Sequence, residues 1–326
     1  MRDNPGVTST PPDRAPLGGP PRDFVGYGRH PPQFRWPGGA AVAISVVLNY
    51  EEGAEYSLLD GDPINDTWGE TSTPLPPPVR DMGTETHYEF GSRVGVWRLV
   101  RMVEELGIPI SVDAPALALE RNPPFARWLR DGPHEVIGHG YRWTEDSQMT
   151  RAQERAHLRR AIESVERSTG QRVRGWIVRT MPSVNTRELL VQEGGFLYDS
   201  DASNDEIPYF VDVAGTPFLV VPYTKVYNDV KYFLAPTYAR PADFLETLRG
   251  GLDYMLAEAE RGFGGRMLTV GVHSRWSGQA HRAGALREFL DYALAREDVT
   301  FMRRVDIARF WIERFGGRAP RTTHST

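Results

Sequence analysis

Short apolar runs alternate with longer amphipathic stretches along most of the chain. The runs are nearly continuous and rich in β-branched residues, which is typical of strands that are buried on both faces. This pattern predicts strands at 40–48, 109–112, 134–137, 174–178, 195–198, 218–221, 267–272 and 299–302.

Helical periodicity fills the intervals between these runs. The stretch 92–106 carries apolar residues at helical spacing and stops at Gly107, a residue type that commonly ends helices. Thr150 is followed three residues later by Gln153, which is the spacing of a capping box at a helix start. The pattern predicts helices at 92–106, 150–168, 186–193, 241–261, 283–296 and 305–315.

Strand–helix alternation of this length indicates an α/β fold with a parallel sheet. Gly26-Tyr27-Gly28 comes before the first strand, where it cannot act as a dinucleotide-binding fingerprint. Seven or eight strands without that fingerprint favour a (β/α) barrel. We expect one catalytic barrel at 23–316, between a disordered tail at 1–22 and a flexible tail at 317–326.

The segment 54–91 breaks the alternation directly after the first predicted strand. It is irregular and contains Pro74 and three consecutive prolines at 76–78. Long loops inside compact domains are usually functional or disordered. We predict that this segment folds over the mouth of the barrel.

Composition and charge narrow the function classes. The net charge of −5 provides no basic field for nucleic acid or anionic lipid. The chain has no cysteine, which excludes disulfides and thiolate chemistry, so any metal needs His, Asp or Glu ligands. No run of 18 apolar residues exists, and residues 1–21 do not resemble a secretory signal. We therefore expect a cytoplasmic protein with no nucleic-acid or membrane partner.

Ionisable residues follow almost every predicted strand. In (β/α) barrels the active site is built from the carboxyl ends of the strands, so residues there are candidate site residues. The residues at these positions are Glu51, Glu52, Asp113, His139, Arg179, Asp199, Asp201 and His273. Chance would scatter such residues over both ends of the strands, and the pattern therefore indicates an enzyme.

Each of these residues also has a structural interpretation. Asp113, Asp199 and Asp201 suit turns and helix caps, and a lone buried histidine is more often a core residue than a catalytic one. His134 and His139 lie one residue too far apart for the HExxH zinc motif, in a segment that has the pattern of a strand. The joint occurrence at strand ends, rather than any single residue, favours function.

At these positions the chain resembles the polysaccharide deacetylase superfamily. The family motif Thr-Phe-Asp-Asp-Gly corresponds to Asn49-Tyr50-Glu51-Glu52-Gly53, and His-(Ser/Thr)-x-x-His corresponds to His139-Gly140-Tyr141-Arg142-Trp143. The family's Arg, Asp and final His motifs correspond to Arg179-Thr180-Met181-Pro182, Tyr198-Asp199-Ser200-Asp201 and His273. The resemblance runs from about residue 23 to residue 315 and implies a distorted barrel of about seven strands.

Several segments are more similar to one branch, the cofactor-independent allantoinases and their relatives. They are 24–32, 49–53, 89–93, 138–143 and 194–201. The chain departs from that branch at Asp113, at 178–186, at 202–209 and at 273–278. Because these positions would line the pocket, the resemblance leaves the substrate open.

The resemblance also implies a metal question. Metal-dependent members hold zinc with an Asp and two His residues, and the corresponding positions here are Glu52, His139 and Trp143. A tryptophan side chain offers only an N–H and cannot ligate a metal. We therefore expect no cofactor. The alternative is zinc or another divalent metal held by Glu52, His139 and Asp113.

The resemblance and the chemistry of amide hydrolysis together suggest roles. We expect Glu51 to be the general base and His273 the general acid, while His139 and Arg179 hold the carbonyl oxygen. Two adjacent carboxylates should raise the pKa of one of them. We further expect Asp199 or Asp201 to orient Arg179 or His273, and Trp143 and Tyr209 to wall the pocket.

Three functions remain open on this basis. The first is hydrolysis of the C–N bond of a cyclic amide or ureide, such as allantoin, without a metal. The second is metal-dependent deacetylation of an N-acetylated sugar or small molecule. The third is a barrel that has lost catalysis. Proteins similar to this branch are commonly homo-oligomers, which we also expect here.

Overall fold

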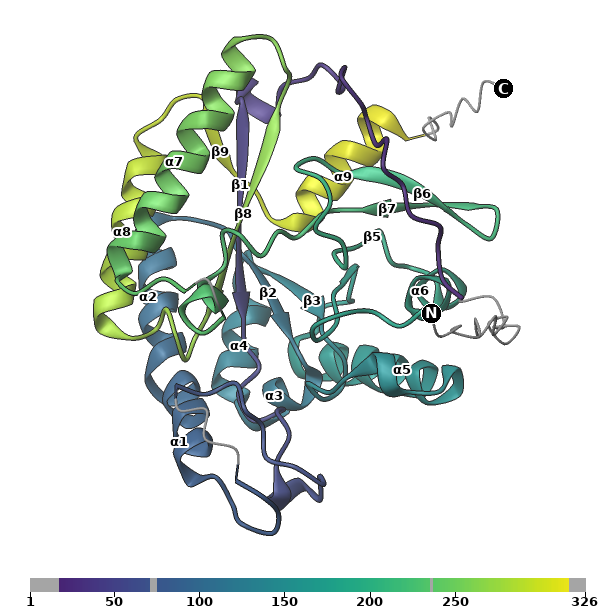
Figure 1. Cartoon of the computed structure of the whole chain (residues 1–326), viewed down its shortest axis with the longest axis vertical. Helices are drawn as coiled ribbons and strands as arrows, with labels where there is room; N and C mark the ends of the chain where they lie inside the picture. Colours follow the sequence, from purple (N-terminus) through teal and green to yellow (C-terminus); the bar gives the residue numbers. More distant parts are fainter. Residues whose placement is uncertain (1–17, 71–74, 235–236, 317–326) are drawn as a thin grey trace, which may run out of the picture.

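The computed structural model describes residues 18–70, 75–234 and 237–316 of the 326-residue chain. Residues 1–17 of the predicted N-terminal tail and the whole predicted C-terminal tail lie outside the described residues. The intervening chain forms a curled sheet with helices packed along its outside (Figure 1).

The sheet has nine strands in the order β6-β7-β5-β4-β3-β2-β1-β8, with β9 paired to β1. Their bounds are β1 Val42–Asn49, β2 Ser111–Ala114, β3 Glu135–Gly138, β4 Gly175–Trp176, β5 Tyr198–Asp199, β6 Tyr209–Val213, β7 Thr216–Val220, β8 Arg266–His273 and β9 Val299–Phe301. All described pairings are parallel except that of β6 with β7. The predicted distorted (β/α) barrel is confirmed, as a half-barrel.

Strand β6 was not predicted from the sequence. It pairs antiparallel with β7 through the two-residue turn Ala214-Gly215, whose φ angles of 50° and 84° are typical of tight hairpins. It lies at the edge of the sheet and is only partly buried, so it lacks the continuous apolar run of the central strands.

The gap between β7 and β8 is spanned by one isolated backbone bridge and by side-chain hydrogen bonds rather than by a strand pair. Asn228 forms an isolated parallel bridge with Gly271 of β8. The fully buried Arg304 donates to Ser200 Oγ after β5, to Thr269 Oγ1 in β8 and to the Val221 carbonyl after β7. These contacts draw the two ends of the curled sheet together.

The helices are α1 Met82–Phe90, α2 Val96–Leu106, α3 Ala116–Arg121, α4 Pro123–Asp131, α5 Arg151–Thr169, α6 Thr186–Glu193, α7 Pro241–Glu260, α8 Ala280–Leu294 and α9 Arg304–Phe315. A π-helical turn, η3 Gly91–Gly95, joins α1 to α2, so helical structure begins earlier than the predicted residue 92. The Thr150–Gln153 capping box of α5 is present as predicted. Helices α1, α3 and α4 were not predicted.

Strands β1 and β8 form the centre of the core. Every residue of β1 is buried, and seven of the eight residues of β8 are buried. They pair in register over eight residues, from Val42–Arg266 to Asn49–His273. Among the residues that the structure describes, no helix combines the length and the apolar character that a bilayer crossing needs.

Candidate active site

The carboxyl ends of β1, β3, β4, β5 and β8 meet at one cavity. Asn49 is level with Asp113 on one side and with His273 on the other, so the residues after β1, β2 and β8 share one height in the barrel. A cavity of about 220 Å³ opens there. Of the predicted site residues, those that line it are Glu51, His139, Trp143, Arg179, Asp201 and His273.

Glu51 lies at the centre of the site. Its Oε1 is 3.6 Å from His139 Nε2 and 3.6 Å from His273 Nε2. Its Oε2 is 2.7 Å from Nη1 of Arg275. Burial alone would favour the neutral acid, but Arg275 and the two histidines outweigh it and hold the pKa of Glu51 well below the usual value of 4.5. Glu51 is therefore an ionised carboxylate between three basic groups.

His273 is held by a carboxylate that the sequence did not point to. Its Nδ1 is 2.6 Å from Oδ1 of Asp229, and Oδ2 of Asp229 accepts from Ser277 Oγ at 2.6 Å and from the His273 amide. Burial opposes the charge, yet Asp229 and Glu51 raise the pKa of His273 to about 9. The imidazole is thus a cation at neutral pH, with Nε2 directed toward Glu51.

Asp229 could not be found from strand ends because it belongs to a short turn. It starts the 3-10 helix η5 Asp229–Tyr232, next to the Asn228–Gly271 bridge that helps to close the barrel. The sequence pattern of residues 227–230 does not indicate that they lie beside β8, so Asp229 could not be identified as a partner of His273 from the sequence.

His139 lines the cavity on the side opposite His273, whereas Asp113, contrary to its predicted place in the substrate site, lies buried and does not line the cavity. His139 Nδ1 is 2.9 Å from the Ile177 carbonyl, so Nδ1 carries the proton and Nε2 faces Glu51. Burial opposes its charge, but Glu51 and Asp113 raise the pKa of His139. Asp113 is fully buried, neither of its carboxylate oxygens has a hydrogen-bond partner among the described residues, and burial raises its pKa to about 6.

Glu52 does not line the cavity, contrary to its predicted place in the substrate site. Its Oε2 accepts from the Glu51 amide at 3.0 Å, and its Oε1 is 3.6 Å from Arg275 Nη1. Burial raises the pKa of Glu52. The pKa of one carboxyl group of the pair is raised, as predicted. The group is Glu52, however, and not Glu51, the expected general base.

Arg179 lines the cavity, but its partners are not the predicted ones. Its Nη1 donates to Asp66 Oδ2 at 2.6 Å and to the Trp143 carbonyl, and its Nε donates to Glu145 at 3.0 Å. Asp66 belongs to the long segment 54–91, which also supplies Trp68 to the cavity wall. Thr180, the next residue, has a φ of 59°, a strained conformation of the kind that concentrates at functional sites.

Asp199 orients neither Arg179 nor His273, so that prediction was wrong. It forms a two-pronged ion pair with Arg187 of α6, at 2.6 and 3.0 Å, because the end of β5 faces the start of that helix. Asp199 does not line the 220 Å³ cavity. It borders a larger neighbouring hollow of about 920 Å³.

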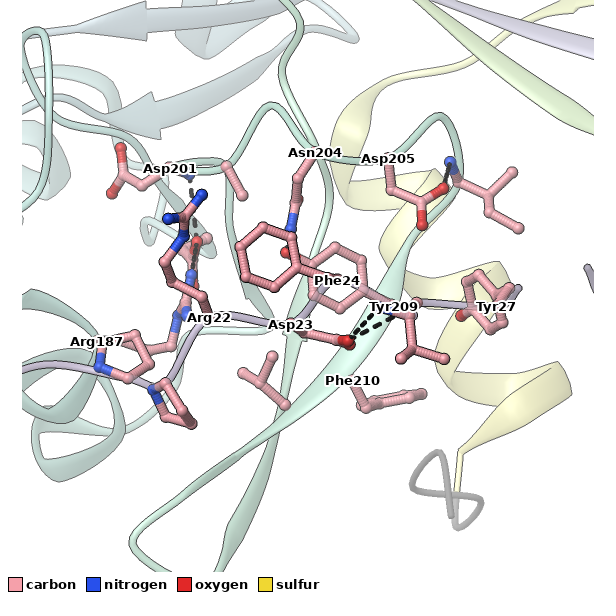
Figure 2. A pocket seen from close by; sticks show the side chains of 18 of the residues that line it. Arg22, Asp23, Phe24, Tyr27, Arg187, Asp201, Asn204, Asp205, Tyr209 and Phe210 are labelled. Carbon is pink, nitrogen blue, oxygen red and sulfur yellow. Dashed lines mark hydrogen bonds and ion pairs between the residues drawn. The ribbon is translucent and has the colours of Figure 1, made fainter. Parts of the chain in front are cut away.

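Figure 2 shows this hollow, which lies between the N-terminal segment 20–31 and the residues after β5. Tyr209 belongs here: its hydroxyl donates to Asn204, and it does not wall the cavity around Glu51 as predicted. Asp201 borders both spaces. It accepts from the Val178 amide at 2.9 Å rather than orienting Arg179 or His273, and burial and Asp199 raise its pKa to about 8.

The residues present do not fit a catalytic metal. Trp143 stands at the position of a family histidine ligand, and its Nε1 is buried without a partner in the described structure. The alternative ligand set of Glu52, His139 and Asp113 is not brought together, since Glu52 faces Arg275. Within the described residues, no group of three His, Asp or Glu side chains has an arrangement that could hold a metal ion.

No protein-family model matches the chain, but similar proteins cover nearly all of it. A putative polysaccharide deacetylase of Schizosaccharomyces pombe is 31% identical over 89% of this chain and 96% of that protein. A solved structure of a probable polysaccharide deacetylase from Pseudomonas aeruginosa PAO1 is 40% identical, covers 91% of this chain and 100% of that one, and has a TM-score of 0.86. The structure of Puue allantoinase has the same identity and TM-score, over 91% of this chain and 99% of that one. With relatives of this extent and a curled sheet that bears the family motifs at its strand ends, the chain belongs to the polysaccharide deacetylase superfamily.

Proposed function

We propose that this protein is an amidohydrolase that opens a small cyclic amide or ureide, such as allantoin, by general acid–base catalysis. The observation that carries the proposal is the pairing of an ionised Glu51 with a cationic His273 across one small cavity. The similarity to an allantoinase over 91% of the chain supports the class of substrate.

The proposed reaction begins with a water molecule beside Glu51. Glu51 accepts a proton from this water as the oxygen attacks the amide carbonyl carbon. Glu51 is a weak base because its pKa is low, so the adjacent cations must contribute by stabilising the negative charge that develops on the carbonyl oxygen. The groups proposed to do so are His139, in its doubly protonated form and through Nε2–H, and Arg179, whose Nη2 is not used in its bonds to Asp66 and Glu145.

The second half of the reaction breaks the C–N bond. His273 donates its Nε2 proton to the leaving nitrogen as the tetrahedral intermediate collapses, which breaks the C–N bond and gives a carboxylic acid and an N–H group in the opened chain. The carboxylic acid loses its proton to solvent, and Glu51 returns the proton taken from water to His273. Asp229 holds the imidazole by Nδ1 and stabilises its cationic form. A pKa of about 9 keeps this acid protonated through the neutral range.

The size of the cavity supports a compact substrate. Drug-sized ligands commonly occupy pockets of roughly 300–1,000 Å³, and this cavity has about 220 Å³. Its walls combine Trp68 and Trp143 with the polar groups around Glu51, which suits a flat, polar heterocycle. A sugar polymer would require a long open cleft instead.

The test is a panel of amide substrates in which ring opening and deacetylation give different products. Purified protein is incubated with allantoin, hydantoins and N-acetylated sugars, and ring opening and acetate release are measured separately. Ring opening that disappears in Glu51→Gln supports the proposal. Acetate release without ring opening would support the deacetylase alternative. The similar proteins of Schizosaccharomyces pombe and Pseudomonas aeruginosa, which are named as polysaccharide deacetylases, favour that alternative. Location in the cytoplasm and homo-oligomeric assembly stay predictions.

A further inference from the structure

Arg275 is an unusually placed cation. It follows β8 by two residues and is fully buried. Three aromatic rings surround its guanidinium carbon, those of Tyr88 at 4.5 Å, Trp276 at 4.3 Å and Trp143 at 5.4 Å. A guanidinium group is removed from water in this way only where opposite charge compensates for the lost hydration.

The compensating charge comes from the paired carboxylates. Nη1 of Arg275 is 2.7 Å from Glu51 and 3.6 Å from Glu52, and Nε donates to the Trp68 carbonyl at 3.2 Å. One nitrogen atom therefore lies between the two acidic residues that follow β1. Trp143, which stands where metal-dependent relatives have a histidine ligand, lies on another side of the same guanidinium.

The surrounding backbone is shaped to admit this arrangement. Helix α1 passes into α2 through the π-helical turn η3, and π-helical turns are frequent at functional sites. Gly91 and Gly95 belong to this turn. A Cβ atom at Gly91 would collide with the Glu52 carboxylate, and one at Gly95 would collide with the Ser274 carbonyl, next to Arg275. The turn thus lets Glu52 and the loop that bears Arg275 approach each other.

We propose that the Arg275 guanidinium takes the place of the catalytic metal ion, supplying from within the chain the positive charge that the carboxylate pair requires. Arg275 is a positioning residue: its ion pair with Glu51, at 2.7 Å, fixes the orientation of that carboxylate toward the two histidines. Arg275 also blocks metal binding. Its fixed positive charge repels a divalent ion, and its ion pair with Glu52 competes with metal coordination by that carboxylate. The role of Arg275 in positioning Glu51 as a base rests on the proposed function, whereas the exclusion of a metal ion by Arg275 does not.

The test is an attempt to restore a metal site. Trp143→His returns the missing imidazole, and the double variant Trp143→His/Arg275→Met also removes the cation. Zinc content after dialysis and zinc affinity by calorimetry are measured on the full chain, with circular dichroism as a check of folding. We expect about one zinc per chain in the folded double variant, and at least tenfold weaker binding in wild type and in Trp143→His.

Two results would overturn the proposal. One is zinc bound as tightly by wild type or Trp143→His as by the double variant, since Arg275 would then not exclude metal. The other is a folded double variant that binds no zinc. These readouts do not depend on which amide is hydrolysed, so failure of the proposed function alone would leave them unchanged.

A second comparison covers the case in which the double variant does not fold. Arg275→Lys keeps a cation in the native background, and Arg275→Gln has a similar length without charge. We expect Arg275→Lys to retain at least tenfold more kcat than Arg275→Gln, with KM similar in both. Equal loss of kcat in the two variants would show that the charge of Arg275 is not its contribution.

Discussion

Replacing Asp229 by asparagine would test the acid half of the proposed mechanism. Asparagine keeps the size of the side chain and can still accept from Ser277 and from the His273 amide, but it removes the charge 2.6 Å from His273 Nδ1. The pKa of His273 would then fall from about 9 toward or below 6.5. That difference corresponds to roughly 3 kcal/mol between the protonated and neutral forms.

The expected effect follows from this difference. At pH 8 about nine tenths of the wild-type imidazole would carry the proton, against about 3% at a pKa of 6.5, which alone gives roughly a 30-fold loss. Loss of ring orientation adds to this, so we expect kcat/KM to fall by about 10²–10⁴. The alkaline limb of the pH–rate profile should move from about 9 to below 7.

The assay is the pH dependence of kcat/KM for wild type, Asp229→Asn and Ser277→Ala. Ser277→Ala removes one hydrogen bond to Asp229 but no charge, so its alkaline limb should stay near that of wild type. An NMR titration of His273 gives the same pKa values without a substrate. An Asp229→Asn profile with an unshifted limb and less than tenfold loss would refute the assignment of His273 as a cationic acid.

Four further predictions follow from the site. Glu51→Gln and His273→Ala should each abolish turnover with unchanged circular dichroism, and an active Glu51→Gln enzyme would contradict its role as base. Exhaustive chelation should leave full activity in a turnover assay, whereas loss that zinc restores would favour the deacetylase alternative. Because the folded-state pKa of Asp113 is raised to about 6, ionisation of this residue lowers the stability of the protein as pH rises from 3.8 through 6. Asp113→Asn should therefore raise the free energy of unfolding at pH 7.5 by up to roughly 3 kcal/mol. Denaturant titrations should show no such gain at pH 4. The stability that protonated His273 contributes is complete below pH 6.5 and lost as pH rises through about 9, so His273→Gln should destabilise more at pH 6 than at pH 9.5 in thermal melts.

Strand ends could be predicted because burial leaves a periodic mark on the sequence. The central strands of a parallel sheet are apolar on both faces, so the polar residue that ends each run, such as Glu51 or His273, is visible without a structure. The edge strand β6 and the short helices α3 and α4 have weaker patterns, since β6 is partly exposed and each of the two helices spans fewer than ten residues.

The partners of the site residues could not be predicted in the same way. Asp229, Asp66 and Glu145 reach His273 and Arg179 across large separations in sequence, and their local patterns are those of ordinary loops. The sequence placed Arg275 after a strand but indicated no role for it, because its meaning depends on Glu51, Glu52 and three aromatic rings converging on it. The partner of Asp199, Arg187, is close in sequence, but nothing in the sequence pattern indicates that the start of α6 faces the end of β5.

The pairing of β1 with β8 has a consequence for how the enzyme becomes active during synthesis. The proposed base follows β1, and the proposed acid and the buried arginine lie at the end of β8, which the ribosome makes more than two hundred residues later. Contacts of such long sequence separation form late and slowly in folding. A nascent chain that ends before β8 would lack His273 and Arg275, so the proposed reaction could not begin until β8 has been made and has paired with β1.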